Sequence, residues 1–275
     1  QSLITSILYK ATRDQVQFIF IDPKRIELGV YADIPHLKTE VVVEPKKAAN
    51  ALRWAVAEME RRYKLLAEVH VRSIDFYNRA IKDPEVRKRL ELTDTEGPVR
   101  DSDLKPLPYY VIIIDELADI MQTYPRELES AIVRLAQMSR AVGIHLILST
   151  QRPSVNVITG LIKANIPARV ALQVSSQIDS RTIIDMAGAE KLLGQGDMLY
   201  LSSEAPQPER IQSAFISEEE VKKVVKFLKE QGRDMLPDEI SLSGTASTER
   251  NLMFEGVLDG GDDEDDDLYE DARLT

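Results

Sequence analysis

Two adjacent carboxylates at the end of an apolar run are the residues of this sequence best suited to chemistry. Asp115 and Glu116 directly follow six apolar residues, Tyr-Tyr-Val-Ile-Ile-Ile. Such a run predicts a buried parallel strand, and open α/β sheets bind ligands at the carboxyl ends of such strands. The first acid could hold Mg²⁺, directly or through water, and the second could orient or deprotonate an attacking water. The alternative is structural, because Asp is a favoured N-cap residue and Asp115 could cap the next helix.

A second polar group follows a second apolar run. Residues 144–148 predict another strand, and Thr150 and Gln151 come just after it. In a parallel sheet these side chains would lie beside Asp115, where they could sense a γ-phosphate, although an ordinary polar turn is the alternative. His145 lies inside the apolar run, which favours a hydrogen-bonded core histidine over a catalytic one.

The composition excludes several classes of protein. The 275 residues are 43% hydrophobic, which is enough for one substantial α/β core or two smaller ones. No apolar run approaches the roughly 20 residues of a membrane span, and the first residues lack the pattern of a signal peptide. The sequence has no cysteine and its three histidines do not cluster, which argues against disulfides, a cysteine nucleophile and a zinc site.

The net charge of -11 is unevenly distributed along the chain. Residues 255–275 contain ten acids and one base, so that segment carries -9 and residues 1–254 carry only -2. Local basic loops in this nearly neutral body could therefore still contact phosphates.

Strand patterns alternate with helical patterns along the chain. This order implies right-handed crossovers and a three-layer α/β fold with a mainly parallel sheet. Gly143 fits the left-handed position that ends a helix before the strand at 144–148. The expected strands are 15–21, 41–43, 109–114, 144–148, 169–174, 197–201 and 210–215, and the expected helices are 2–9, a long one from 45, a second one to about 90, 126–142 and 217–232.

Several ordered segments resemble the motor domain of the FtsK/SpoIIIE family of DNA translocases. They are residues 22–28 (DPKRIEL), 160–169 (GLIKANIPAR), 174–181 (VSSQIDSR) and 188–199 (GAEKLLGQGDML), together with the Walker B pattern at 109–116. The resemblance covers about residues 1–232 and implies a RecA-like P-loop NTPase fold. It also implies ATP and Mg²⁺ as cofactors, with ATP the only small-molecule substrate. Members form homo-hexameric rings of full-length copies that pump double-stranded DNA in chromosome segregation during cell division or sporulation.

The resemblance assigns roles to five residues at the nucleotide. Asp115 would hold Mg²⁺ through water, Glu116 would activate the attacking water, and Thr150 with Gln151 would form the sensor. Arg140 matches an arginine that reaches the ATP of a neighbouring subunit, where a guanidinium stabilises the transferring phosphoryl group. A solvated arginine near a helix C-terminus is the alternative for Arg140.

The resemblance also assigns the contacts with DNA. Arg152 and the segment from Gln177 to Arg181 resemble two pore loops that touch the DNA backbone, and such contacts carry no base information. Many relatives have lysine in place of Gln177, which weakens one expected phosphate contact. The alternative for Arg181 is an ion pair with Asp179 or Asp185 on its own helix.

The sequence departs from the family at its phosphate-binding loop. No Gly-x-x-x-x-Gly-Lys-Ser/Thr occurs in the 275 residues, and the relatives need this loop for ATP. In relatives it directly precedes the helix that residues 2–9 resemble. We therefore expect a motor domain truncated at its N-terminus (1–232), an acidic flexible linker (233–267) and the start of a truncated C-terminal winged-helix DNA-reading domain (268–275). We expect little ATP hydrolysis by this chain alone.

Two other readings stay open from the sequence. A relative that naturally lacks the P-loop could bind DNA or join a ring without ATPase activity. Conjugative coupling proteins and type VII secretion ATPases share the Walker B strand and the RecA-like core, but segments 163–169 and 188–199 favour the DNA translocases. The resemblance implies a cytoplasmic motor portion, with the full-length protein anchored in the bacterial inner or cell membrane through a region that precedes these residues.

Overall fold

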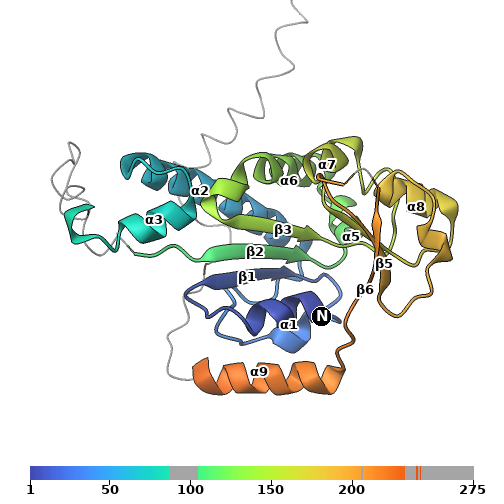
Figure 1. Ribbon diagram of the computed structural model, residues 1–275, viewed down its shortest axis with the longest axis horizontal. Coiled ribbons are helices and arrows are strands. Elements are labelled where there is room, and N and C mark those ends of the chain that lie inside the picture. The colour runs from blue at the N-terminus through green and yellow to red at the C-terminus, as the bar shows by residue number, and fades with distance from the viewer. Residues whose placement is uncertain (87–104, 206, 233–239, 241, 243–275) are drawn as a thin grey trace, which may run out of the picture. The chain divides into compact units, whose positions relative to one another are not determined.

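The computed structural model describes residues 1–86, 105–205, 207–232, 240 and 242, and these contain two three-stranded sheets with their helices (Figure 1). Nearly all of the expected linker and the whole expected start of a winged-helix domain lie outside the described residues. Among the described residues, no helix combines the length and the apolar character needed to cross a bilayer.

The first sheet is parallel, as the sequence predicts. Its strands are β1 (Val16–Ile21), β2 (Tyr109–Ile114) and β3 (Ile144–Leu148), with β2 in the centre. Ile21 is paired with Ile114, which in turn is paired with Leu148, so the three strands end in line. The residues that follow the three strands therefore lie together at the carboxyl-terminal edge of the sheet, where the strands end.

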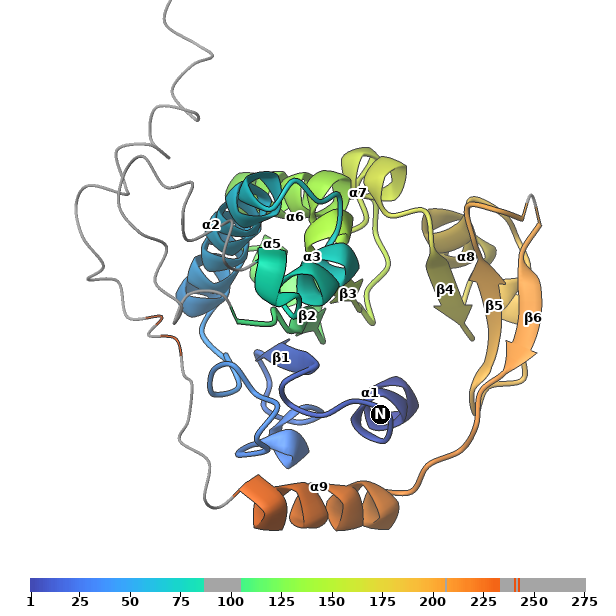
Figure 2. The ribbon, with the colours of Figure 1, turned by 60° about the vertical axis from the view of Figure 1, so that its left-hand side comes forward.

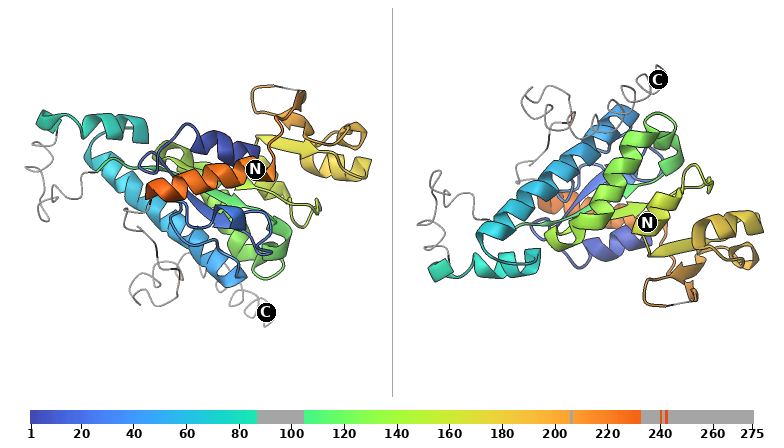
Figure 3. Two further views of the ribbon diagram at one scale, coloured as in Figure 1. Left: turned by 90° about the horizontal axis from the view of Figure 1, so that it is seen from below. Right: turned by 90° about the horizontal axis from the view of Figure 1, so that it is seen from above.

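Helices cover both faces of this sheet and make the three layers (Figure 2). On one face, α1 (Ser2–Leu8) and α9 (Glu218–Gly232) pack on a core that includes Phe18 and Phe20 of β1. On the other face lie α2 (Pro45–Glu68) and α6 (Pro125–Met138), which run side by side (Figure 3). The stripe of apolar residues on α2 is buried there, because it faces the sheet and α6.

The second sheet is antiparallel throughout. It contains β4 (Arg169–Leu172), β5 (Asp197–Leu201) and β6 (Glu209–Gln212), and α8 (Gln177–Ile184) packs on one of its faces. Seven residues join β5 to β6, and a link this short joins antiparallel neighbours, because parallel neighbours need a crossover of a dozen or more residues. The remaining elements are η1 (Gly29–Tyr31), α3 (Ile74–Ala80), α5 (Leu117–Met121), η2 (Ser139–Val142), α7 (Gly160–Asn165) and η3 (Ala189–Lys191).

Three local expectations differ from the structure. The expected strand at 41–43 is a single bridge between Ile21 and Val42. The expected second helix is interrupted, because α3 ends at Ala80 and residues 84–86 are helical again, and its expected end near residue 90 lies outside the described residues. His145 is exposed instead of lying in the core, because β3 pairs with β2 on one side only among the described strands. Its ring stacks on that of Tyr109, with 5.9 Å between the ring centroids.

Candidate active site

The carboxyl ends of the parallel strands bring the predicted nucleotide residues together. The backbone N–H of Asp115 donates to the carbonyl of Ile21 at 3.0 Å, and that of Ser149 donates to Ile114 at 2.9 Å. These bonds extend the ladder by one residue beyond each strand. Asp115 and the segment that begins at Ser149 therefore lie side by side, as the parallel arrangement predicts.

Glu116 is the centre of this edge, and its side chain is fully buried. Its Oε1 accepts hydrogen bonds from the Thr150 hydroxyl at 2.5 Å and from the backbone N–H of Ala118 at 3.2 Å. Its Oε2 accepts one from the backbone N–H of Gln151 at 3.1 Å. Both predicted sensor residues thus touch the predicted catalytic carboxylate.

The bond from Ala118 also decides which acid caps the next helix. Glu116 is the N-cap residue of α5, and its side chain accepts the hydrogen bond from the first turn. The capping role considered for Asp115 therefore belongs to Glu116. Asp115 is left half-buried, and its carboxylate accepts no hydrogen bond from any residue that the structure describes.

The surroundings of Asp115 suit a cation. Burial raises the pKa of its carboxyl group, and the carboxylates of Asp22, Glu27 and Glu116 raise it further, while Lys24 lowers it. A cation at this place would relieve the repulsion among these acids. Magnesium in nucleotide sites is bound by one or two carboxylates, with waters and phosphates completing its shell. One free carboxylate fits that need, although no group of three or more His, Asp or Glu among the described residues could hold a metal alone.

Asp22 is a further acid at this edge to which the sequence assigned no role. It directly follows β1, is fully buried, and lies near enough to Asp115 to raise its pKa. Its own oxygens are already occupied, since three backbone N–H groups donate to them at 3.0 to 3.1 Å. These groups belong to Lys24, Glu27 and Leu28. Asp22 therefore shapes the turn and the local potential and is not a free ligand.

Arg140 lies at the amino ends of the strands of the same sheet, opposite to Glu116 and Thr150. It belongs to η2, which precedes β3, whereas Thr150 follows β3, so the strand's five residues separate them by about 16 Å. Arg140 is exposed, yet its turn is fixed to α2. The Tyr63 hydroxyl donates to the carbonyl of Met138 at 2.5 Å, and Arg62 Nη1 donates to that of Val142 at 2.8 Å. The structure therefore does not bring Arg140 to the carboxylates of its own chain.

Arg152 lies beside the carboxylates, but it is paired. Its guanidinium forms an ion pair with Asp119 in the first turn of α5. Its backbone N–H donates to the Thr150 hydroxyl at 3.1 Å. Just over half of the Arg152 side chain is exposed, so it borders both the site and solvent.

Gln177 and Arg181 lie apart from this edge, on α8 of the second sheet. Both side chains are exposed, and their spacing of four residues places them on one face of the helix. Ser176 caps the helix by accepting a hydrogen bond from the backbone N–H of Asp179 at 3.1 Å. These two residues thus form a second exposed polar surface, distinct from that of Arg152.

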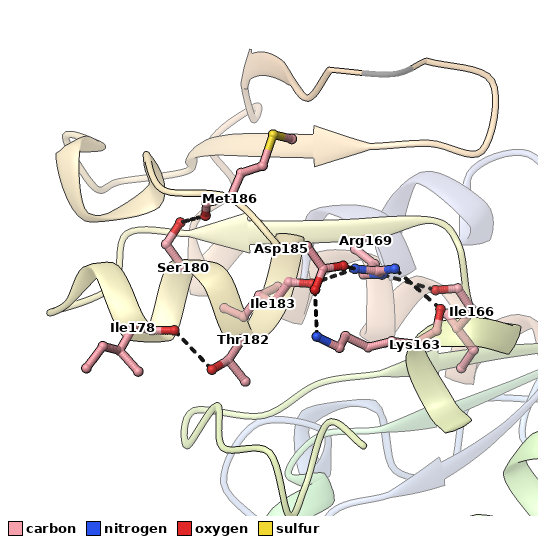
Figure 4. A network of polar contacts seen from close by, with 9 residues as sticks. All are labelled: Lys163, Ile166, Arg169, Ile178, Ser180, Thr182, Ile183, Asp185 and Met186. Carbon is pink, nitrogen blue, oxygen red and sulfur yellow. Dashed lines mark hydrogen bonds and ion pairs between the residues drawn. The ribbon is translucent and has the colours of Figure 1, made fainter. Parts of the chain in front are cut away.

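The ion pair considered as the alternative for Arg181 is made by other residues. Asp185 accepts from Lys163 at 2.7 Å and from Arg169 at 2.5 Å (Figure 4). Arg169 also donates to three backbone carbonyls, so it joins the ends of α7 and α8. Arg181 has no ion pair among the described residues, and its guanidinium faces solvent.

Comparison with known sequences gives matches to the FtsK/SpoIIIE family model and to DNA translocases. The model of the FtsK/SpoIIIE family matches residues 1–155. DNA translocase FtsK of Clostridium tetani is 53% identical over 264 residues, which cover 94% of this chain and 33% of that protein. DNA translocase FtsK of Shewanella oneidensis is 50% identical over 279 residues, which cover 98% of this chain and 30% of that protein. The chain thus spans about a third of the length of these curated relatives.

Solved structures share the fold. The conjugation coupling protein TcpA of pCW3, solved with ATPγS, superposes with a TM-score of 0.63 and is 23% identical, over 82% of this chain and 60% of that one. EssC of Geobacillus thermodenitrificans has a TM-score of 0.64 and 18% identity, over 87% of this chain and 42% of that one. These likenesses confirm the predicted RecA-like α/β fold. The coupling and secretion ATPases are far less similar in sequence than the DNA translocases.

Proposed function

The chain belongs to the FtsK/SpoIIIE family, and we propose that it is part of the motor of an ATP-driven translocase of double-stranded DNA. The observation that carries this proposal is the contact of Thr150 and Gln151 with Glu116 at the carboxyl edge of a parallel sheet. A carboxylate that activates water and the residues that sense the γ-phosphate must work at one place. The translocase serves chromosome segregation in cell division or sporulation.

Asp115 is the magnesium residue of this proposal. Its carboxylate is half-buried and lies among other acids, as a cation-binding group requires. Magnesium, when bound with ATP, supplies charge neutralisation at the β- and γ-phosphates. Asp115, at the end of β2, would hold that ion directly or through a water.

Glu116 is the residue that positions and deprotonates the attacking water. Three donors fix its carboxylate, so its orientation depends on Thr150 and Gln151. A γ-phosphate that contacts Thr150 or Gln151 would therefore change the hydrogen bonds that orient the Glu116 carboxylate. This gives the two sensor residues a physical role in hydrolysis.

Arg140 acts on the nucleotide of a neighbouring copy in a homo-hexameric ring around DNA. Its place at the opposite edge of the sheet from Glu116 supports action between subunits. In a mixture of R140A and E116Q proteins, some interfaces combine an intact Arg140 with an intact Glu116. We expect each variant to be inactive alone and the mixture to regain part of the ATPase activity. A mixture as inactive as its components would contradict action between subunits.

The DNA contacts come from Arg152 and from Gln177 with Arg181. All three side chains are exposed, and Arg181 has no ion pair among the described residues. Exposed polar and cationic groups of this kind bind phosphates without reading bases. They are thus suited to a motor that moves along DNA of any sequence.

The phosphate-binding loop comes from outside these 275 residues, because they contain no Gly-x-x-x-x-Gly-Lys-Ser/Thr. The side of β3 away from β2 supports this, because it pairs with no described strand. Leu146, Ile147 and Leu148 are only partly buried, although the residues of parallel strands are normally buried on both faces of the sheet. A further strand at this edge would place its loop beside Thr150. Attachment to the membrane in the complete protein also comes from residues outside this chain.

The test measures ATP hydrolysis by the complete protein, with and without random-sequence duplex DNA. We expect DNA to stimulate hydrolysis, and E116Q to lower the rate by at least about 100-fold while ATP still binds. E60Q is the matched control, because Glu60 is an exposed acid paired with Arg134 on the helical layer. Absence of stimulation by DNA, or a rate for E116Q equal to that for E60Q, would contradict the proposal.

A second measurement uses the 275-residue chain itself. Without a loop to hold the phosphates, its carboxylates have no phosphate to act on, so we expect little magnesium-dependent turnover. Substantial turnover by the purified chain would show that it binds ATP in another way. It would also exclude the alternative that this chain is a P-loop-less relative without ATPase activity.

A further inference from the structure

Asp119 forms ion pairs with two cationic side chains at the border of the candidate site. It lies in the first turn of α5, and its side chain is only 23% exposed. Its Oδ1 pairs with the guanidinium of Arg152, and its Oδ2 lies 3.6 Å from Nζ of Lys24. Both cationic side chains are more exposed than the acid, at 52% for Arg152 and 41% for Lys24.

The pairing holds a short loop to α5 at two points. The side chain of Arg152 is bound to Asp119, and its backbone N–H is bound to the Thr150 hydroxyl. That hydroxyl in turn donates to Glu116, which caps the same helix. The residues from Thr150 to Arg152 are therefore fixed to α5 by the catalytic carboxylate at one end and by Asp119 at the other.

We propose that Asp119 is an exchangeable counter-ion that holds Arg152 on α5 until a DNA phosphate replaces it. This inference rests on the proposed function, which makes Arg152 a DNA contact. A guanidinium binds carboxylate and phosphate oxygens with the same geometry, so the two anions compete for one group. Asp119 is thus a positioning residue for the DNA contact, and every encounter with DNA must first overcome the ion pair.

The proposal predicts a gain of affinity from the loss of an acid. In D119N the shape of the side chain is kept and its charge is removed, so Arg152 becomes available to DNA. We expect the complete protein to bind a random-sequence 30-base-pair duplex about two- to five-fold more tightly, since ion pairs of this exposure are weak. A merely structural role for Asp119 would instead lower the affinity together with the stability.

The matched control is D33N. Asp33 also forms an ion pair, with Lys229 at 3.1 Å, and it is 83% exposed. Its φ of 62° is one that Asn tolerates well. D33N removes the same charge from another part of the surface, and we expect its DNA affinity to stay within about 1.5-fold of wild type.

A double-mutant cycle assigns the effect to Arg152. R152A should weaken DNA binding, and D119N should have no further effect in that background. A gain that persists without Arg152 would assign the effect to Lys24 and overturn the proposal, as would unchanged or weaker binding by D119N alone. If the wild-type protein binds no duplex DNA, the proposed function itself fails. If it binds DNA through Arg152 and D119N does not strengthen binding, only the role of Asp119 fails.

Discussion

Replacing Arg62 with alanine should destabilise the protein far more than a surface substitution on the same helix. Arg62 belongs to α2, and its side chain is fully buried against the turn that carries Arg140. Its Nε donates to Glu58 at 2.8 Å, and its Nη1 donates to the carbonyl of Val142 at 2.8 Å. Its guanidinium also lies 4.2 Å from the centre of the Tyr110 ring.

The magnitude follows from the groups that lose their partner. Removal of one member of a buried ion pair costs about 3–5 kcal/mol, because the other charge stays buried. The lower end applies to Glu58, which keeps two hydrogen bonds from Arg61 at 2.7 and 2.8 Å. Val142 loses a donor to its carbonyl, which adds about 1 kcal/mol. We therefore expect a loss of about 3–4 kcal/mol in the free energy of unfolding.

Urea denaturation of the 275-residue chain measures this loss. With a denaturant dependence of about 3 kcal/mol per molar, the midpoint should fall by about 1 M. The matched control is R61A, because Arg61 binds the same carboxylate from the surface, with 53% of its side chain exposed. R61A should cost less than about 1 kcal/mol.

The pKa of Glu58 gives the effect of pH. Burial alone would raise this pKa, but the hydrogen bonds from Arg61 and Arg62 outweigh it and lower the pKa below its ordinary value. The pair therefore stabilises the fold above the unfolded pKa of Glu58, and this part is lost as pH falls through the folded pKa. The double variant E58L/R62M should be nearly as stable as wild type. An R62A protein no less stable than R61A, or a double variant as unstable as R62A, would refute this reasoning.

Three further predictions concern single positions. G143A should lower the free energy of unfolding by about 1–3 kcal/mol in the same urea assay, because Gly143 has a φ of 74° and a Cβ there would lie 2.6 Å from a side-chain atom of α3. D75N should lower the pKa of Tyr109, which burial and the hydrogen bond to Asp75 raise to about 12, and ultraviolet titration of tyrosine ionisation measures the shift against Y109F. Q177K should strengthen binding of duplex DNA by the complete protein and steepen its dependence on log salt by about 0.9, whereas Q137K on exposed α6 should leave that slope unchanged. An equal slope for both lysine variants would contradict a DNA contact at Gln177.

The sequence predicts the central part of the site because that part depends on few physical rules. Apolar runs of five or six residues form the parallel strands β2 and β3, and the carboxyl ends of these strands lie together. Asp115 and Glu116 directly follow the first run and Thr150 comes two residues after the second, so their proximity needs no further information. Gly143 likewise adopts the left-handed conformation that its place after a helix predicts.

Side-chain partners in the loops could not be predicted in this way. Whether Asp115 or Glu116 caps α5 depends on how the backbone leaves the strand, and a shift of one residue exchanges the two roles. The pairing of Asp119 with Arg152 joins groups 33 residues apart through a loop whose path the sequence pattern does not define. Asp22 is buried beside Asp115 although Asp is usually a surface residue, because its turn supplies three backbone donors.

The short distance along the chain between Arg152 and Thr150 has a mechanical consequence for the proposed motor. The two residues are separated only by Gln151, whose backbone N–H is bound to Glu116. A residue spans at most about 3.3–3.6 Å, so a displacement of the Arg152 backbone by more than a few ångströms must lengthen a bond to Glu116, whereas a rotation of the side chain alone need not. That carboxylate would then lose one of its three donors and become free to turn toward the nucleotide. In the proposed motor, DNA contact that moves this backbone would thus change the orientation of Glu116 through three consecutive residues, without a longer path through the core.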